Sequence, residues 1–257
     1  MSQITLLNSD AWSKADLLTK MKDDNFYYDY LGQNALSSSN VKLLLQSPKT
    51  YNYVTKYGSK QTSALRDGWL FHTAILEPNK YEQLEFIEVQ SKATKKFKEA
   101  KEKNSNVFTA KEKSEAERLI DAFYKNEYAL QMITDCEFEV PAIGLIENQP
   151  FRAKADVLCD NKIVDIKTTN DIGGFKYSVK KYHYDVQVFI YCKLFNIDYT
   201  NFKFLVIDKK SLDIGIFDVS EETYINGKNK TYQAIETYKE FFIDGADIDS
   251  YCIRGIV

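Results

Sequence analysis

Cysteine is scarce in this 257-residue sequence, and no long apolar segment occurs in it. The four cysteines, Cys136, Cys159, Cys192 and Cys252, are widely spaced and form no Cys-x-x-Cys pair. Such spacing argues against a zinc site or an iron–sulfur cluster and predicts reduced thiols in a cytoplasmic protein. A membrane-spanning helix needs about 20 apolar residues, and the N-terminal residues lack the pattern of a signal peptide. We therefore expect no membrane partner.

An excess of positive charge is also missing. The chain has 34 Lys and Arg against 37 Asp and Glu, a net charge of −3. Because proteins hold DNA through Lys and Arg contacts to phosphates, a strongly basic chain would have indicated nucleic acid directly. The 34 basic residues can still form one positive cleft, so net charge neither supports nor excludes DNA. No G-x-x-x-x-G-K-[ST] segment occurs, which argues against an ATP-driven motor in this chain.

Hydrophobic residues make up 44% of the chain and aromatic residues 14%, enough for the core of a single domain. Successive β-rich runs, CEFEVPAIGLI, FRAKADVLC and KIVDIKTT, follow a long stretch of helical pattern. This order predicts an α/β domain with a mixed central sheet flanked by helices. The expected parts of the domain are a lead-in (1–35), a helical N-terminal part (35–135), the catalytic sheet with its helices (136–220) and a C-terminal helix (221–257).

Three segments carry more specific expectations. The charge-rich stretch 92–106 is predicted to be a solvated helix or a mobile loop. Apolar residues at helical spacing predict one long amphipathic helix over about 110–133, and helical patterning returns over 174–195.

The residues most indicative of chemistry lie on two of the β-rich runs. Side chains alternate across a strand, so Asp165 and Lys167 in KIVDIK point to the same face. Asp160-Asn161 is a plausible tight turn between this run and FRAKADV, which carries Asp156. If the two runs pair through that turn, both carboxylates and the lysine converge on one spot.

Such a group suits phosphodiester hydrolysis. Carboxylate oxygens hold Mg²⁺, which polarises a phosphoryl group and lowers the pKa of a bound water. A lysine beside the metal can orient that water or stabilise charge on the phosphate. The alternative is a surface hairpin with ordinary charges, because a D…D-x-K pattern often arises by chance.

Two further segments bear on this choice. Tyr184, Gln187 and Tyr191 share one helical face; a core helix would explain the tyrosines but not the glutamine. His72 lies on the predicted helix RDGWLFHTAIL, where a lone histidine is more often a core residue than a metal ligand.

Taken together, these residues occur in the order G-x-x-x-H, K/R-x-D, D-x-K-T-T and Q-x-x-x-Y. This order resembles the RecB-like branch of the PD-(D/E)XK nuclease superfamily. The segments LSSSNVKLLLQSPKTYNY, DGWLFHTAILEP, FRAKADVL, IVDIKTT and KYHYDVQVFIY further resemble the RecE, or exonuclease VIII, nuclease domain of phages and prophages. The resemblance covers about residues 35–210 and implies a restriction-endonuclease-like core.

The resemblance also implies roles for individual residues. His72, Asp156, Asp165 and the backbone carbonyl of Ile166 would bind one or two Mg²⁺ or Mn²⁺ ions. Lys167 would serve the nucleophilic water, and Gln187 and Tyr191 would support the site or touch the DNA backbone. The expected DNA contacts are Arg152, Lys154, Lys176, Lys180, Lys181 and Tyr184.

The function implied is a metal-dependent exonuclease that degrades one strand from double-stranded DNA ends, in the 5′→3′ direction, during phage-type recombination. The expected assembly is a ring-shaped trimer or tetramer around DNA, and the expected partner is a single-strand annealing protein. Two alternatives stay open at this point: a restriction or repair endonuclease of the same superfamily, and a non-catalytic DNA-binding protein that kept the fold.

Overall fold

The computed structural model describes residues 3–59, 62–104 and 106–253. Parts of the predicted lead-in, charged stretch and C-terminal segment (1–2, 105 and 254–257) lie outside these residues. The N-terminal part folds into β1 (Gln3–Thr5), β2 (Ala11–Ser13), α1 (Lys14–Lys20), η1 (Phe26–Tyr30), α2 (Leu31–Asn34), α3 (Ser38–Gln46) and α4 (Pro48–Tyr57). Serines start two of these helices as N-caps: Ser37 Oγ accepts from Asn40 N at 3.3 Å, and Ser47 Oγ accepts from Thr50 N at 3.0 Å.

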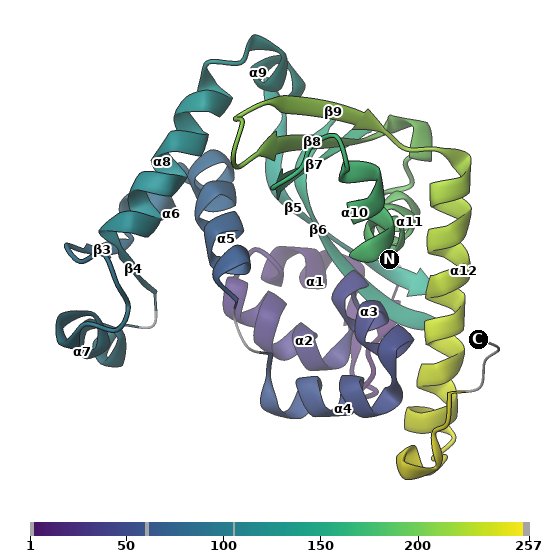
Figure 1. The fold of residues 1–257 in the computed structure, drawn as a ribbon. Helices are drawn as coiled ribbons and strands as arrows, with labels where there is room; N and C mark the ends of the chain where they lie inside the picture. Colours follow the sequence, from purple (N-terminus) through teal and green to yellow (C-terminus); the bar gives the residue numbers. More distant parts are fainter. Residues whose placement is uncertain (1–2, 60–61, 105, 254–257) are drawn as a thin grey trace.

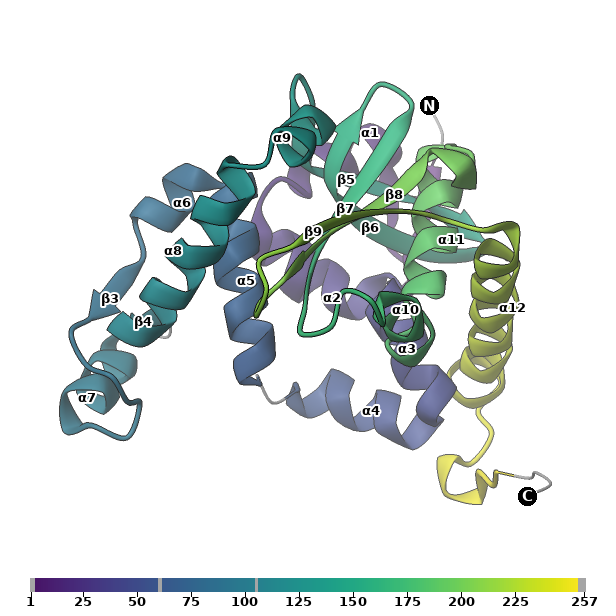
Figure 2. The ribbon, with the colours of Figure 1, turned by 45° about the horizontal axis from the view of Figure 1, so that its top comes forward.

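A second group of elements extends to one side of the molecule. It comprises α5 (Ser63–Leu76), α6 (Pro78–Glu82), β3 (Glu85–Ile87), α7 (Lys95–Lys103), β4 (Val107–Thr109), α8 (Ala110–Tyr124) and α9 (Glu127–Ile133). Strands β3 and β4 pair in parallel to form a small separate sheet. We call the segment from α6 to α8 the arm; in both ribbon views its outer end is α7, and α5 lies between the arm and the main sheet (Figures 1 and 2).

The main sheet has five strands in the order β5-β6-β7-β8-β9. These are β5 (Glu137–Ile146), β6 (Gln149–Cys159), β7 (Lys162–Thr169), β8 (Phe202–Asp208) and β9 (Ile214–Asp218). Strands β7 and β8 pair in parallel, and the other neighbours pair antiparallel. The crossover between β7 and β8 consists of α10 (Phe175–Lys181), α11 (Tyr184–Phe195) and η2 (Tyr199–Asn201). The chain continues through α12 (Glu221–Tyr238), η3 (Lys239–Ile243) and η4 (Ile248–Ser250).

Helices cover both faces of this sheet, as predicted. On β8, Phe202, Phe204 and Val206 point into a core that they share with α3, α11 and α12. The intervening Leu205 and Ile207 point into the opposite core, which α5, α8 and α9 complete. Period-two alternation along a strand buried on both faces produces this arrangement. The mixed α/β fold class is confirmed.

Two predicted helices are interrupted. The amphipathic helix over 110–133 ends at Tyr124 and restarts at Glu127, because the Asn126 side chain caps α9 by accepting from Ala129 N at 2.9 Å. The helix over 174–195 breaks before Tyr184, where His183 has a φ of +53°. Hydrophobic periodicity continued across both breaks, so it could not locate them. The charged stretch 92–106 was predicted to be a solvated helix or a mobile loop, and most of it forms the helix α7.

The expectation of reduced thiols is wrong for two of the four cysteines, because Cys136 and Cys159 form a disulfide. These residues lie at the adjoining ends of β5 and β6, one step beyond the pair Glu137 and Leu158. Spacing along the sequence could not reveal this pairing. In the part of the chain that the structure describes, no helix is long and apolar enough to cross a membrane.

Candidate active site

The site forms where β6 and β7 part. The two strands meet through the Asp160-Asn161 turn, as predicted, but their pairing covers only Val157–Cys159 with Lys162–Val164. Beyond this pairing, Ile166 N of β7 donates its hydrogen bond to a side chain of β6 instead of to the β6 backbone. The acceptor is Asp156 Oδ2, at 2.8 Å. Asp156 is thereby held against the middle of β7.

Asp165 lies on β7 and is fully buried. Its Oδ1 accepts a hydrogen bond from Gln187 Nε2 of α11 at 2.5 Å, and the Lys167 ammonium forms an ion pair with its Oδ2. Burial raises the pKa of Tyr191, one turn further along α11, and Gln187 opposes this shift. The glutamine that a simple core helix left unexplained thus holds one of the two predicted carboxylates.

His72 reaches the same point from α5, on the other side of the sheet. Its Nδ1 lies 3.5 Å from Asp156 Oδ2. The Ile166 backbone lies against the same ring and favours its protonated form, although burial outweighs this effect. The structure therefore brings together the four groups that the sequence suggested as metal ligands.

Burial controls the protonation of this cluster. It lowers the pKa of His72 to about 4, and the Lys167 charge acts in the same direction, so the ring is neutral near pH 7. Burial raises the pKa of Asp156, and it raises that of Asp165 to about 6 against the opposing effect of Lys167. Burial alone would lower the pKa of Lys167, but Asp165 and Asp156 raise it above its usual value, and the lysine stays charged.

Two cavities meet at His72, which lines both. The first, of about 670 Å³, is bordered by Asp156 and Tyr191 and by Trp69, Asn106 and Phe108 next to the arm. The second, of about 940 Å³, is bordered by Lys167, Gln187 and Tyr184 and by residues of α3, α5 and α10. The candidate site is therefore accessible from two sides.

Lys42 of α3 is a site residue that the sequence did not single out. Its Nζ lies 5.3 Å from the centre of the Tyr184 ring, and Lys167 Nζ lies 5.1 Å from the same ring. Burial, together with the Lys167 charge, lowers the pKa of Lys42 to about 8. The only available signal was its place in the motif LSSSNVKLLLQSP, where nothing distinguishes it from an ordinary surface lysine.

The residues predicted to contact DNA fall into two groups. Arg152 is buried and donates from Nε to Leu31 O at 3.1 Å, and Lys154 pairs with Asp24 at 2.9 Å and with Glu139 at 3.6 Å. Both cationic groups thus contact protein atoms, although both residues also line the first cavity. By contrast, Lys176, Lys180 and Lys181 of α10 lie on the surface side of that helix, and Tyr184 lines the second cavity.

The donor atoms match the needs of a divalent metal ion. Two carboxylates and a backbone carbonyl are hard oxygen ligands that suit Mg²⁺ or Mn²⁺, and a neutral imidazole is a ligand of divalent transition metals. Asp165 Oδ2 is buried and accepts no hydrogen bond of good geometry, although the Lys167 ammonium lies against it. Among residues 3–59, 62–104 and 106–253, no three His, Cys, Asp or Glu side chains are spaced as a ready metal-binding group. The chemistry fits a metal, and metal binding would require small adjustments of these side chains.

Comparisons with known proteins agree with this fold. A solved structure from Eubacterium rectale, provisionally called an exonuclease, aligns with a TM-score of 0.64 and 15% identity over 91% of this chain and 95% of that chain. A second, SSO0001, has a TM-score of 0.42 at 14% identity over 87% and 84% of the two chains, which is too distant to support an inference. A search of curated proteins found no relative that matches. The family described as "PDDEXK-like domain of unknown function (DUF3799)" matches residues 37–247, and the chain belongs to this PD-(D/E)XK family.

Proposed function

We propose that this protein is a divalent-metal-dependent nuclease that hydrolyses phosphodiester bonds of DNA. The observation that carries the proposal is the convergence of Asp156, Asp165, Lys167 and His72 where two cavities meet. Membership of the PD-(D/E)XK family supports a nuclease, and nucleases of this type generally use divalent metals.

The site residues would have separate roles in this reaction. Asp156, Asp165, neutral His72 and the Ile166 carbonyl would hold the metal, and Gln187 would keep Asp165 in place. When bound, the metal would polarise the phosphoryl group and acidify a water. Lys167 keeps its proton, so its ammonium can donate to a water or to a phosphate oxygen as negative charge develops.

More specifically, we propose that the protein is an exonuclease that acts on double-stranded DNA ends in the 5′→3′ direction. The support is the motif resemblance to RecE-like nucleases. The same resemblance supports a ring-shaped trimer or tetramer, a single-strand annealing protein as partner and a role in phage-type recombination.

The test is degradation of end-labelled linear duplex with Mg²⁺ or Mn²⁺, with covalently closed circular duplex as the control. We expect loss of the linear substrate only, and no loss in EDTA. Asp165→Asn should abolish cleavage while DNA binding persists, because a ligand carboxylate is removed from an otherwise intact site. Cleavage of the circle would favour an endonuclease, and turnover by the variant near the wild-type rate would contradict the site assignment.

A further inference from the structure

The helix α7 concentrates positive charge in a chain that is acidic elsewhere. Residues 92–104 contain six lysines and two glutamates, a net charge of +4. Because the whole chain carries −3, the remaining residues carry −7. Such a local excess attracts polyanions while the rest of the surface repels them.

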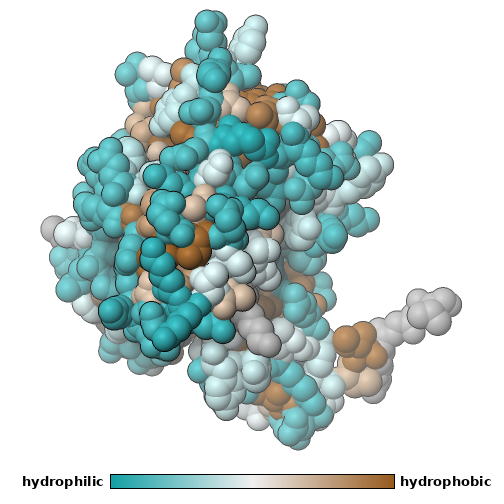
Figure 3. Space-filling model, turned by 60° about the vertical axis from the view of Figure 1, so that its left-hand side comes forward, coloured by the Kyte–Doolittle hydropathy of each residue, from teal (hydrophilic) through white to brown (hydrophobic). Residues whose placement is uncertain are grey.

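The packing of α7 leaves its lysines on the surface, where Lys95 pairs with Glu99 of the same helix at 3.6 Å. The helix buries one apolar face through Phe97, which is 3% exposed and packs with Ile87 and Val107. All five of its lysines are exposed: Lys95, Lys96, Lys98, Lys101 and Lys103. On the side of the molecule that carries the arm, the surface is mostly hydrophilic, with only small separate hydrophobic patches (Figure 3). A charged ligand suits this surface better than an apolar protein interface.

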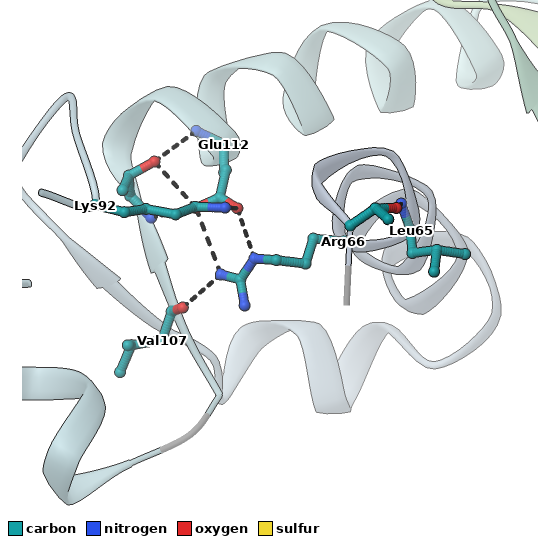
Figure 4. A network of polar contacts seen from close by, with 7 residues as sticks. Leu65, Arg66, Lys92, Val107 and Glu112 are labelled. Carbon is teal, nitrogen blue, oxygen red and sulfur yellow. Dashed lines mark hydrogen bonds and ion pairs between the residues drawn. The ribbon is translucent and has the colours of Figure 1, made fainter. Parts of the chain in front are cut away.

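The base of the arm is fixed to α5, the helix that carries His72. Arg66 of α5 donates from Nε to Glu112 Oε1 at 2.9 Å and from Nη2 to Val107 O at 2.7 Å, and Lys92 Nζ lies 2.7 Å from Glu112 Oε1 (Figure 4). Next to this network, the rings of Trp69 and Phe108 stack at 5.6 Å. The position of the α7 lysines relative to the active site is therefore set by side-chain contacts.

The arm also borders the active site directly. Asn106 and Phe108 line the first cavity together with His72 and Asp156, and α7 ends at Lys103, three residues before Asn106. Nucleic acid leaving this cavity toward the arm would meet α7 next.

We propose that the α7 lysines bind the phosphate backbone of duplex DNA outside the active site. This inference rests on the proposed function, because it names the substrate surface of the same enzyme. A nine-residue helix is about 13.5 Å long, and one DNA strand presents a phosphate about every 3.4 Å along its axis. The helix is therefore long enough to contact several phosphates of the duplex. The interaction is with the backbone and carries no base specificity.

The test measures duplex binding in EDTA, where no cleavage occurs, by fluorescence anisotropy over a range of salt. The arm variant replaces Lys95, Lys98 and Lys101 with Gln. The matched control replaces three exposed lysines of other helices, Lys56, Lys193 and Lys228, with Gln. The slope of log affinity against log salt should become shallower by about 0.9 for each phosphate that the variant no longer neutralises. We expect a change of about 2 to 3 and at least tenfold weaker binding at about 50 mM salt in the arm variant alone.

A second variant tests whether weaker binding could result from misfolding, because a misfolded protein would not bind DNA more tightly. Glu99→Gln with Glu102→Gln makes α7 more positive and should strengthen binding. Equal slopes for the arm variant and the control would overturn the proposal, and the lysines would then serve another polyanion, such as an acidic protein surface. A wild-type protein that binds duplex as expected but cleaves no DNA with metal would contradict the proposed function and leave this inference standing.

Discussion

The substitution Glu112→Gln isolates the ionic contribution of the network that joins the arm to α5. Glu112 is 9% exposed and contacts Arg66 and Lys92. It also accepts from Thr109 N at 2.9 Å in a capping box at the start of α8. Glutamine has the same shape and can still accept that backbone hydrogen bond. The variant therefore mimics the protonated glutamic acid.

The magnitude follows from the pKa. Burial would raise the pKa of Glu112, but hydrogen bonds from Arg66 and Lys92 outweigh it and lower the pKa from 4.5 to about 2. Since each pKa unit corresponds to about 1.4 kcal/mol, the charge contributes about 3 kcal/mol to the free energy of unfolding at pH 7. Because the pKa of Glu112 is lower in the folded state than in the unfolded state, its charge stabilises the fold at pH values above the unfolded-state pKa of about 4.5. This stabilisation is lost as the pH falls from about 4.5 toward 2. With these two pKa values, the contribution of Glu112 to the free energy of unfolding decreases by about 1.4 kcal/mol between pH 7 and pH 3.5.

The assay is urea unfolding of wild type and Glu112→Gln at several pH values. We expect a difference of about 3 kcal/mol at pH 7 that narrows as the pH falls. Glu117→Gln on the same helix is the control, because its exposed pair with Lys113, at 3.7 Å, should contribute less than about 1 kcal/mol. A wild-type advantage that stays constant down to pH 3.5, or that equals the control, would refute the reasoning.

Three further predictions concern other residues. Lys42→Met should lower kcat/KM about 10- to 100-fold, because a charge-assisted hydrogen bond to phosphate contributes about 1.5–3 kcal/mol; unchanged kinetics would exclude a substrate role. Gln187→Ala should weaken apparent metal affinity or activity about 10- to 100-fold by releasing Asp165, as measured by metal titration of cleavage; an unchanged titration would count against this support. Reduction of the Cys136–Cys159 bond, which closes a loop with a sequence separation of 23, should cost about 3 kcal/mol. Thermal melts with and without reductant would show it, Cys159→Ser should match the reduced protein, and melts unaffected by reductant would contradict it.

Several features of the fold could be predicted from local pattern. Alternation in KIVDIK placed Asp165 and Lys167 on one face, and the Asp160-Asn161 turn predicted the pairing of the strands on either side. Serine caps marked the starts of α3 and α4. These features depend on a few neighbouring residues, and so the chain alone specifies them.

The helix breaks and the disulfide could not be predicted in this way. A helix ends where a cap or a left-handed residue outweighs continuing periodicity, as at Asn126 and His183. Cys136 and Cys159 are neighbours only because β5 and β6 pair in one particular register.

What the sequence determined by itself was the identity of the chemical groups: two carboxylates, a lysine, a histidine and a glutamine in a recognisable order. Only the tertiary structure decided how they act together. It parts β6 from β7 so that Asp156 reaches Ile166 N, and it places Gln187 against Asp165 from a helix 22 residues away. It also gives Arg152 and Lys154 partners within the protein and brings Lys42 into the site. The physical reason is that burial and charge pairing depend on which surfaces meet, and these surfaces join residues far apart in the chain.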